Sequence, residues 1–314
     1  MNRTQWYPLL EARYPDLKSF TNIEHTLRIT YEHLNSHENI VISVSGGSDS
    51  DCVVHLICNY FPEYLYKCRF VFIHTGLEWR ATINHLKYLE SKYNIKVETI
   101  RGLSVVLSVK RYGVPVISKY HSQIINGYTR DAPSAIQRIN NSRTVARGYT
   151  FSLKQKQLAQ AIKDRQIKVS DKCCKYSKKQ PFDRYVKQIS CDLSITGERK
   201  MEGGIRAISY TSCFVCAKSK GYDKYMPLYW WDDKTKEDFK KAEGIRYSDC
   251  YEVYGMLRTG CCGCPCNSRV NHDLNIMRTY EPSLFKACMN VFGQSYKIMD
   301  EFKIRKQPIL EGLE

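Results

Sequence analysis

One short segment constrains the fold of this chain more than any other. Residues 40–44, Ile-Val-Ile-Ser-Val, have the apolar, β-branched character of a buried strand, and they run directly into the glycine-containing loop 45–50, Ser-Gly-Gly-Ser-Asp-Ser. A helix is expected from residue 49 to residue 60. Glycines between a strand and a helix let backbone N–H groups approach an anion at the positive end of the helix dipole. The spacing fits neither G-x-x-x-x-G-K-[ST] nor G-x-G-x-x-G, so neither of those loops is present here.

Short apolar strands alternate with helices around this segment. Further strands are expected at residues 70–73, 96–100 and 192–196, and helices at 22–38 and 80–93. Such alternation is typical of a parallel sheet covered by helices on both faces. The sequence therefore predicts an α/β fold of the Rossmann-like kind.

The domain organisation is less clearly marked. Residues 112–180 are polar, basic and interrupted by glycines and prolines, and cysteines become dense after residue 197. We expect an N-terminal helical segment at 1–38, an α/β domain carrying the loop at 39–212, and a cysteine-rich, basic C-terminal region at 213–314. A chain of 314 residues can bury a core of this size.

The charge balance is strongly basic. Lys and Arg number 48 against 32 Asp and Glu, a net charge of +16, which favours anionic partners such as nucleotides, nucleic acid, sulfate or phosphate. A solvated cationic surface is the alternative. No apolar run of 18 residues and no secretory signal is visible, so a cytoplasmic protein without a membrane partner is expected.

The loop and several later segments together resemble a known family. The loop 45–50 is similar to the pyrophosphate loop (PP-loop) of the adenine-nucleotide α-hydrolase superfamily, in particular its phosphoadenosine phosphosulfate (PAPS) reductase branch. The other matching segments are His74–Glu78 (HTGLE), Tyr112–Pro115 (YGVP), Gly197–Arg199 with Arg206, and Pro227…Trp231 followed by Gly260–Pro265 (GCCGCP).

The resemblance implies roles for individual residues. A phosphate or sulfate of an adenine nucleotide would be held by the loop residues Ser45, Gly46, Gly47, Asp49 and Ser50. His74 and Thr75 would lie near the adenosine, and Arg199 and Arg206 suit bidentate contacts with phosphate or sulfate oxygens. Asp49 and Arg199 are the candidate catalytic residues. An ordinary glycine-rich turn, a structural histidine and surface salt bridges are the corresponding alternatives.

Fourteen cysteines in a chain without an export signal suggest metal or redox chemistry. The arrangement of a vicinal pair followed by C-x-x-C resembles the [4Fe–4S] pattern of adenylylsulfate reductases, which implies the ligands Cys173, Cys174, Cys261 and Cys264. A zinc site built from Cys213, Cys216, Cys261 and Cys264 is the alternative, because two C-x-x-C turns make a tetrahedral Cys₄ set. Cys262 and Cys266 could shift the ligand frame, and unligated thiols are the third reading.

The resemblance breaks at the nucleophile of the sulfonucleotide reductases, which attack sulfur with a cysteine in a short C-terminal segment. No cysteine follows Cys288 here. ATP-using members with an iron–sulfur cluster, the DNA phosphorothioation sulfurtransferases, split ATP at the α-phosphate, and SGGxDS is the loop form of ATP-pyrophosphatase relatives. The preferred expectation is therefore ATP cleavage to AMP and pyrophosphate, with Mg²⁺, in sulfur transfer to an acceptor.

Partners and alternatives follow from this expectation. A nucleic acid is a candidate acceptor, and a sulfur donor or a thiol reductant protein is required. Candidate nucleic-acid contacts are the lysines near the cysteines: Lys175, Lys178, Lys179, Lys218 and Lys220. The alternatives are a sulfonucleotide reductase with an internal thiol such as Cys213 or Cys216, and an inert nucleic-acid-binding module with structural zinc.

Overall fold

The structure, a computed structural model, describes residues 10–140, 150–202, 210–217 and 221–312. These form two compact units, each assembled from separate stretches of chain. Unit 1 comprises residues 1–73, 81–100 and 182–259, and unit 2 comprises residues 74–80, 101–181 and 260–314. The division into 1–38, 39–212 and 213–314 stays a prediction, since compactness alone does not define functional domains.

Unit 1 is built on one mixed sheet. Its strands are β1 (Ile40–Ser43), β2 (Cys68–His74), β3 (Val97–Arg101), β4 (Leu193–Ile195), β5 (Phe214–Val215) and β6 (Asp223–Tyr225). The strands follow the order β3-β2-β1-β4-β6-β5. β1 pairs in parallel with both β2 and β4, β4 pairs in parallel with β6, and the short edge strand β5 is antiparallel to its neighbour β6. The sheet is therefore mainly parallel, as the sequence predicted.

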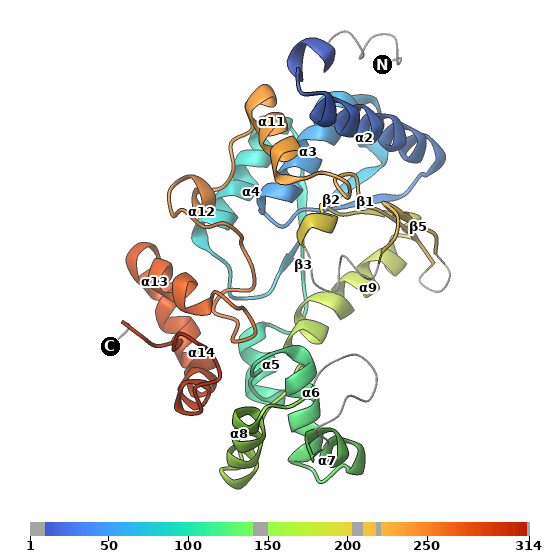
Figure 1. Cartoon of the computed structure of the whole chain (residues 1–314). Helices are drawn as coiled ribbons and strands as arrows, with labels where there is room; N and C mark the ends of the chain where they lie inside the picture. Colours follow the sequence, from blue (N-terminus) through green and yellow to red (C-terminus); the bar gives the residue numbers. More distant parts are fainter. Residues whose placement is uncertain (1–9, 141–149, 203–209, 218–220, 313–314) are drawn as a thin grey trace. The chain divides into compact units, whose positions relative to one another are not determined.

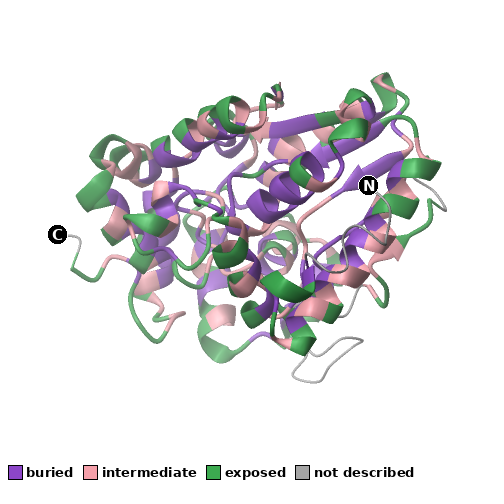
Figure 2. Ribbon diagram, turned by 90° about the horizontal axis from the view of Figure 1, so that it is seen from above, coloured by how far each residue is buried: buried purple, intermediate pink, exposed green. Residues whose placement is uncertain are grey.

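Alternate residues of β1 face two different layers of helices. Ile40 and Ile42 belong to the large core formed with α2 (Leu17–Ser36), α3 (Ser48–Tyr60), α4 (Arg80–Tyr93) and α11 (Asp233–Glu243). Val41 belongs to a second cluster formed with α9 (Gln180–Gln188). Figure 1 shows α2, α3 and α11 on one side of the strands and α9 on the other, and Figure 2 shows the buried strands between them. Helices cover both faces, which confirms the predicted α/β class.

The remaining elements of unit 1 are short, namely η1 (Pro62–Lys67), η3 (Lys200–Glu202) and α12 (Asp249–Glu252). The elements expected from the first hundred residues are present within a few residues of their predicted ends. The largest shift is at α2, which begins at Leu17 rather than residue 22. The Asp16 side chain accepts a hydrogen bond from the Ser19 backbone N–H and caps the earlier turn.

The strand order places a topological switch point beside β1. The chain proceeds from β1 to β2 and β3 on one side, then returns to β4 on the other side. Loops that leave the carboxyl ends of β1 and β4 therefore diverge, and open α/β sheets bind ligands at such a switch point. The loop 45–50 follows β1 and Gly197 follows β4, so both predicted segments lie at this point.

Unit 2 is helical. Its helices are α5 (Val105–Tyr112), α6 (Lys119–Tyr128), α7 (Pro133–Asn140), α8 (Leu153–Asp164), the π-helical turn η2 (Lys175–Lys179), α13 (Val270–Tyr280) and α14 (Pro282–Glu301). Its buried side chains include Ile125, Leu158, Leu274 and Phe292. The π-turn lies immediately before Pro181, which has no N–H to continue the ordinary hydrogen-bond ladder. Sequence periodicity did not predict the helical turn of residues 173–179 because this proline reads as a break.

A buried carboxylate joins distant parts of unit 1. Glu243, the last residue of α11, accepts hydrogen bonds at Oε1 from Tyr14 (2.7 Å), Tyr60 (2.6 Å) and Arg13 (3.0 Å), and its Oε2 lies 3.1 Å from Nε2 of His55. Burial would raise the pKa of Glu243, but the hydrogen bonds from His55, Tyr60 and Tyr14 outweigh burial and lower it to about 2. The charged form of Glu243 therefore stabilises the fold.

We expect Glu243→Ala to lower the free energy of unfolding by about 3–5 kcal/mol, because it removes one member of a buried, hydrogen-bonded charge network. Glu237→Ala on the exposed side of the same helix should change it by less than about 1 kcal/mol. Since the folded pKa is depressed, the wild-type advantage should be full above pH 4.5 and disappear as the pH falls toward 2. Urea titrations across that range measure the difference, and equal effects of the two substitutions would contradict the network.

Candidate functional site

Hydroxyl groups hold the loop after β1. Ser50 Oγ donates to the Gly47 carbonyl at 2.8 Å and accepts from the Ser45 N–H at 3.2 Å, while the Gly47 N–H donates to Ser45 Oγ at 3.3 Å. The N-cap residue of α3 is Gly47, so no side chain caps the helix. The N–H groups of its first turn thus remain directed at the space where an anion would bind.

Two glycines let the strand ends approach this loop closely. Gly46 has φ +65°, and an added Cβ there would lie 2.7 Å from Cγ2 of Thr82. A Cβ on Gly197, after β4, would lie 2.9 Å from the carbonyl oxygen of Asp49 and 3.0 Å from the N of Ser50. The β4 turn therefore packs backbone against backbone on the first turn of α3, and a side chain at either glycine would displace the loop.

Two cations share one carboxylate at the start of α3. Arg199 Nε lies 2.9 Å and Lys236 Nζ 2.8 Å from Oδ1 of Asp49. Lys236 also donates to Oγ of Ser48 at 2.7 Å, and Arg199 Nη1 lies 2.9 Å from Oδ1 of the exposed Asp233. Arg199 is almost fully buried; burial would lower its pKa, but the charge of Asp49 outweighs burial and raises it. Both cations contact residues of the uncapped first turn of α3, so the arrangement suits a polyphosphate.

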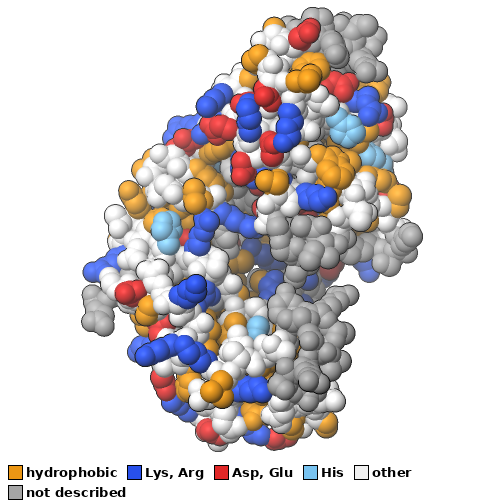
Figure 3. All heavy atoms as spheres, viewed as in Figure 1, with side chains coloured by type: hydrophobic (Ala, Val, Ile, Leu, Met, Phe, Trp, Pro, Cys, Tyr) orange, Lys and Arg blue, Asp and Glu red, His pale blue; other side chains and the backbone are white. Residues whose placement is uncertain are grey.

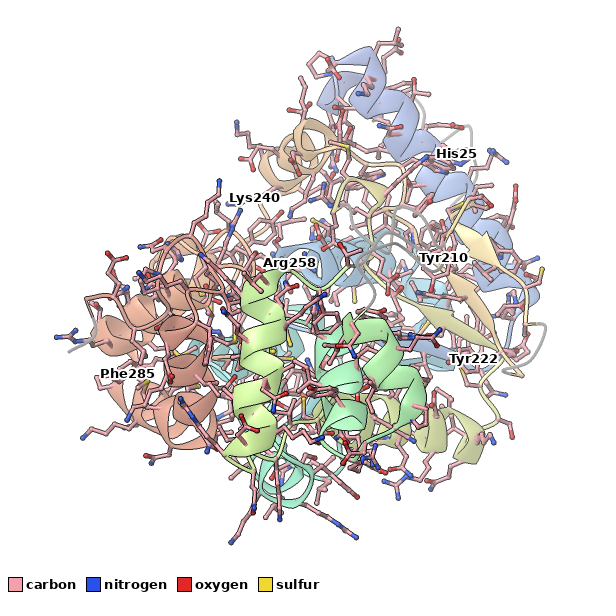
Figure 4. The ribbon with its side chains drawn as sticks, turned by 60° about the horizontal axis from the view of Figure 1, so that its bottom comes forward. His25, Tyr210, Tyr222, Lys240, Arg258 and Phe285 are labelled. Atoms are coloured by element: carbon pink, nitrogen blue, oxygen red, sulfur yellow. The ribbon has the colours of Figure 1, made fainter. Side chains whose placement is uncertain are left out.

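Lys236 was not identified from the sequence. It is one of four lysines in α11, and only the packing of α11 brings it to the loop. Its Nζ lies 5.7 Å from the ring centre of Tyr247, whose other cationic neighbour is Lys240, labelled in Figure 4. Lys240 pairs with Glu252 of α12 at 3.0 Å. This packing holds α11 and α12 in register beside the loop.

Replacing Lys236 tests its role. We expect Lys236→Ala to weaken adenine-nucleotide binding about tenfold or more, because a charge-assisted hydrogen bond is worth roughly 1.5–3 kcal/mol. Lys241→Ala on the same helix removes an exposed lysine and should leave affinity unchanged. Calorimetric titration with ATP measures both, and equal affinities of the two variants would show that Lys236 only neutralises Asp49.

Two hydroxyl groups, one from α12 and one from the segment after it, also lie beside Gly47. An added Cβ on Gly47 would lie 3.2 Å from Oγ1 of Thr259 and 3.4 Å from the hydroxyl of Tyr251. The two hydroxyls lie 3.0 Å apart and so form a pair beside the loop. The sequence carried no signal for either residue, because they meet the loop only through tertiary packing.

A buried pair supports α3 from behind the loop. His85 Nε2 of α4 lies 2.8 Å from Oδ2 of Asp51, and Asp51 is fully buried. Its other oxygen, Oδ1, is buried without a hydrogen-bond partner among the described residues. Burial raises the pKa of Asp51. The pair ties the first turn of α3 to α4 and was also not anticipated from the sequence.

The predicted adenosine residues His74 and Thr75 are engaged in a local turn of unit 2. Thr75 donates through both its N–H and Oγ1 to Oε1 of Glu78, each at 2.6 Å, and His74 Nδ1 lies 3.5 Å from Oε2 of the same carboxylate. Glu78 thus closes the HTGLE segment. The adenosine role of His74 and Thr75 stays a prediction, and Arg206 lies outside the described residues.

The four predicted cluster cysteines all belong to unit 2. Cys174 shares side-chain hydrogen bonds with Cys173 and Cys261. The bond with Cys174 lowers the pKa of Cys173 and, together with burial, raises that of Cys261. Cys264 shares a hydrogen bond with Cys266, which lowers the pKa of Cys264. The vicinal pair and the second C-x-x-C are therefore neighbours, with Cys266 as a fifth thiol.

Two lysines accompany these thiols. Burial alone would lower the pKa values of Lys119 and Lys178, but the thiols of Cys174 and Cys261 outweigh burial and raise both. Lysines in this position would offset the negative charge of several thiolates. Lys178, a predicted nucleic-acid contact, is thus placed beside Cys261 instead.

The contacts between these thiols do not amount to a complete metal site. Within the described part of the chain, no three His, Cys, Asp or Glu side chains are arranged to hold a metal ion. The alternative zinc set draws Cys261 and Cys264 from unit 2 but Cys213 and Cys216 from unit 1, where Cys213 packs on the core and Cys216 is exposed. Both ligand sets stay predictions.

The remaining lysines predicted as nucleic-acid contacts divide into two groups. Lys175 and Lys179 are exposed on η2, whereas Lys218 and Lys220 lie outside the described residues. On the face shown in Figure 3, Lys and Arg side chains are scattered among other surface groups rather than gathered in one place.

Among the helices described, none is long and apolar enough to cross a membrane.

A mainly parallel sheet with a phosphate-type loop at its switch point defines a nucleotide-binding fold of the α-hydrolase-like class. Residues 39–267, more than half of the chain, match the family model of the phosphoadenosine phosphosulfate reductase domain, and the chain belongs to that family. Membership implies an adenine nucleotide as the ligand. The family is one of enzymes.

Individual relatives are distant. An uncharacterized protein of Methanocaldococcus jannaschii, MJ0066, is 23% identical over 273 residues, which are 85% of this chain and 44% of that protein, so the chain spans less than half the length of this relative. A PAPS reductase from Candida auris in a phosphate complex is 13% identical with a TM-score of 0.47, covering 75% of this chain and 87% of that one. A U34-tRNA thiolase from Methanococcus maripaludis with its [4Fe–4S] cluster is 11% identical with a TM-score of 0.36, covering 87% and 78%.

Proposed function

We propose that this chain cleaves ATP between the α- and β-phosphates, giving AMP and pyrophosphate, to activate an acceptor for sulfur transfer. Family membership supplies the adenine nucleotide. The observation that carries the choice of bond is the pair of cations, Arg199 and Lys236, held on one carboxylate at the uncapped start of α3. Such a site is built for the charge of a leaving pyrophosphate.

The chemistry follows from where charge develops. An acceptor oxygen attacks the α-phosphorus, the bond from the α-phosphorus to the bridging oxygen breaks, and its electron pair leaves with pyrophosphate. A sulfur nucleophile from the donor then attacks the acceptor carbon, and the bond from that carbon to the adenylylated oxygen breaks, so that AMP leaves with this oxygen. Arg199, Lys236 and the first-turn N–H groups of α3 receive this charge in place of Asp49. They are preorganised, because Gly197 and the serine hydroxyls fix the loop before the nucleotide arrives.

Asp49 would then take a second role. Its carboxylate, released by the two cations, suits Mg²⁺ bound jointly with phosphate oxygens, since Mg²⁺ prefers one or two carboxylates together with substrate phosphates. When bound, the ion would neutralise further charge on the leaving group. Asp49 and Arg199 are accordingly the proposed catalytic residues, with Ser45, Gly46, Gly47 and Ser50 as binding residues.

The cysteines of unit 2 are the proposed ligands of an iron–sulfur cluster. Cys173, Cys174, Cys261 and Cys264 supply a four-thiol donor set, and Lys119 and Lys178 lie beside it to offset its charge. When bound, a cluster would supply a place for sulfur or electrons during transfer. The chain's own contribution is the thiol set and the two neighbouring cations.

Product analysis tests the proposal. Protein purified without oxygen is incubated with total RNA, DNA fragments and one nucleotide (ATP, PAPS or adenylylsulfate), and pyrophosphate and sulfite are measured. Pyrophosphate from ATP alone is the expected result. Sulfite from either sulfonucleotide would instead indicate a reductase with an internal thiol. If the protein neither binds nor converts any of the three nucleotides, the remaining alternative is a nucleic-acid-binding module without catalytic activity.

A further inference from the structure

Two tyrosines of unit 2 form a stacked pair at its surface. The rings of Tyr112, at the end of α5, and Tyr176, in η2, lie 4.7 Å apart at an interplanar angle of 13°. Both side chains are partly exposed. Near-parallel tyrosines that are not sealed in a core present an aromatic surface to solvent.

Three exposed cations surround the pair. Lys172 Nζ lies 5.1 Å and the Arg111 guanidinium 5.3 Å from the ring centre of Tyr112, while Lys175 Nζ lies 5.6 Å from that of Tyr176. Segments 105–112 and 172–181 contain six Lys and Arg but no Asp or Glu. Within the described residues, no carboxylate lies within ion-pair distance of these three cations, unlike the lysines of α11.

The backbone holds the pair in place. Gly113, directly after Tyr112, has φ +107°, and an added Cβ there would lie 2.3 Å from the carbonyl oxygen of Lys168. A Cβ on Gly102 would lie 2.3 Å from the carbonyl oxygen of Tyr176. Close packing on both sides limits movement of the rings, so little ordering would be needed when a ligand binds.

A flat aromatic pair with unpaired cations matches one chemistry. Bases stack on aromatic side chains irrespective of sequence, while the neighbouring phosphates are neutralised by Lys and Arg. Bases in a duplex already stack on one another, so only an unpaired strand can use the rings. An acidic peptide would engage the cations but not the stacked rings.

We propose that Tyr112 and Tyr176, with Arg111, Lys172 and Lys175, form a binding surface for single-stranded nucleic acid. This surface names the class of acceptor and, in that sense, rests on the proposed function. Binding to it is independent of nucleotide cleavage and can be measured alone.

Fluorescence anisotropy of the full chain with a labelled 15-nucleotide single strand, as RNA and as DNA, tests the surface. We expect Tyr112→Ala/Tyr176→Ala to raise Kd about tenfold or more, because base stacking on an aromatic side chain contributes that much per base. Tyr66→Ala is the matched control, since Tyr66 is exposed in unit 1 with Lys67 Nζ 5.9 Å from its ring centre. It should leave Kd unchanged.

Salt dependence tests the cations separately. Each phosphate contact on a single strand contributes about 0.7 to the slope of the logarithm of the binding constant against the logarithm of salt concentration. Lys172→Ala/Lys175→Ala removes two such contacts and should therefore reduce the magnitude of this slope by about 1.4. Lys87→Ala/Lys96→Ala removes the same charge from exposed positions of unit 1 and should not change the slope.

The outcomes separate this inference from the proposed function. Equal Kd for the wild type and the double tyrosine variant, equal affinity for a duplex of the same sequence, or no binding at low salt would each overturn the surface. ATP affinity is measured on the same variants and should be unchanged. Normal ATP cleavage with no strand binding would reject the surface alone, whereas strand binding without nucleotide binding would reject the proposed function alone.

Discussion

Gly47→Val is expected to abolish adenine-nucleotide binding while leaving the fold intact. Gly47 has φ −95°, which valine adopts without strain, so the backbone itself tolerates the change. The new Cβ would lie 3.1 Å from Oγ of Ser45, and the valine methyl groups would extend into the space that the first-turn N–H groups face. Affinity should fall on the order of a hundredfold or more, since at least two charge-assisted hydrogen bonds of about 1.5–3 kcal/mol each are lost.

Calorimetric titration with ATP and with PAPS measures this effect. The matched control is Gly293→Ala in α14, where an added Cβ meets nothing within 4 Å. Thermal unfolding of both variants shows whether the fold persists. A folded Gly47→Val protein that binds either nucleotide as tightly as the wild type would overturn the loop assignment.

Cys173→Ser or Cys174→Ser is expected to remove bound iron almost completely. Four thiolates around iron should give a brown protein with broad visible absorption and nearly equal amounts of iron and sulfide. Cys213→Ser and Cys216→Ser should leave iron in place, because those thiols are not among the proposed ligands. Cys58→Ala, at a buried core position, is the control for general destabilisation.

The alternative ligand set predicts the reverse pattern. A zinc protein is colourless, and it would lose metal on substitution of Cys213 or Cys216 but not of Cys173 or Cys174. Metal content and absorption are measured on protein prepared without oxygen, because exposed thiolates oxidise readily. Loss of metal only in the second pair of variants would contradict the proposed ligands.

Local pattern was sufficient to predict β1 to β4, but not the two- and three-residue strands β5 and β6. The strand at 40–44, the loop 45–50 and the helix after it are specified within about twenty residues, because a buried parallel strand is almost wholly apolar and glycine marks its turn. Their pairing order required tertiary information, since apolar strands of similar length carry no record of which neighbour they join. The π-helical turn η2 was not predicted, because Pro181 indicates a helix break at this point of the sequence.

The site was predicted as far as it is continuous in sequence. Asp49 and Arg199 were predicted as catalytic residues, and in the structure Arg199 Nε lies 2.9 Å from Oδ1 of Asp49. Lys236, Tyr251 and Thr259 were missed, because each comes from a segment whose composition is that of an ordinary surface helix or loop. Only the packing of α11 and α12 brings them to the loop, and no periodicity encodes such a contact.

The position of the broken bond in ATP tests the central claim most directly. Wild-type protein is supplied with γ-labelled ATP, total RNA, DNA fragments and sulfide. The Asp49→Asn variant is the blank, and it gives the background rate of ATP cleavage. We expect the label to appear in pyrophosphate, with AMP as the other nucleotide product, at a rate that falls to that of the blank in Arg199→Ala. Label in inorganic phosphate with ADP as the product, unchanged in Arg199→Ala, would contradict the account.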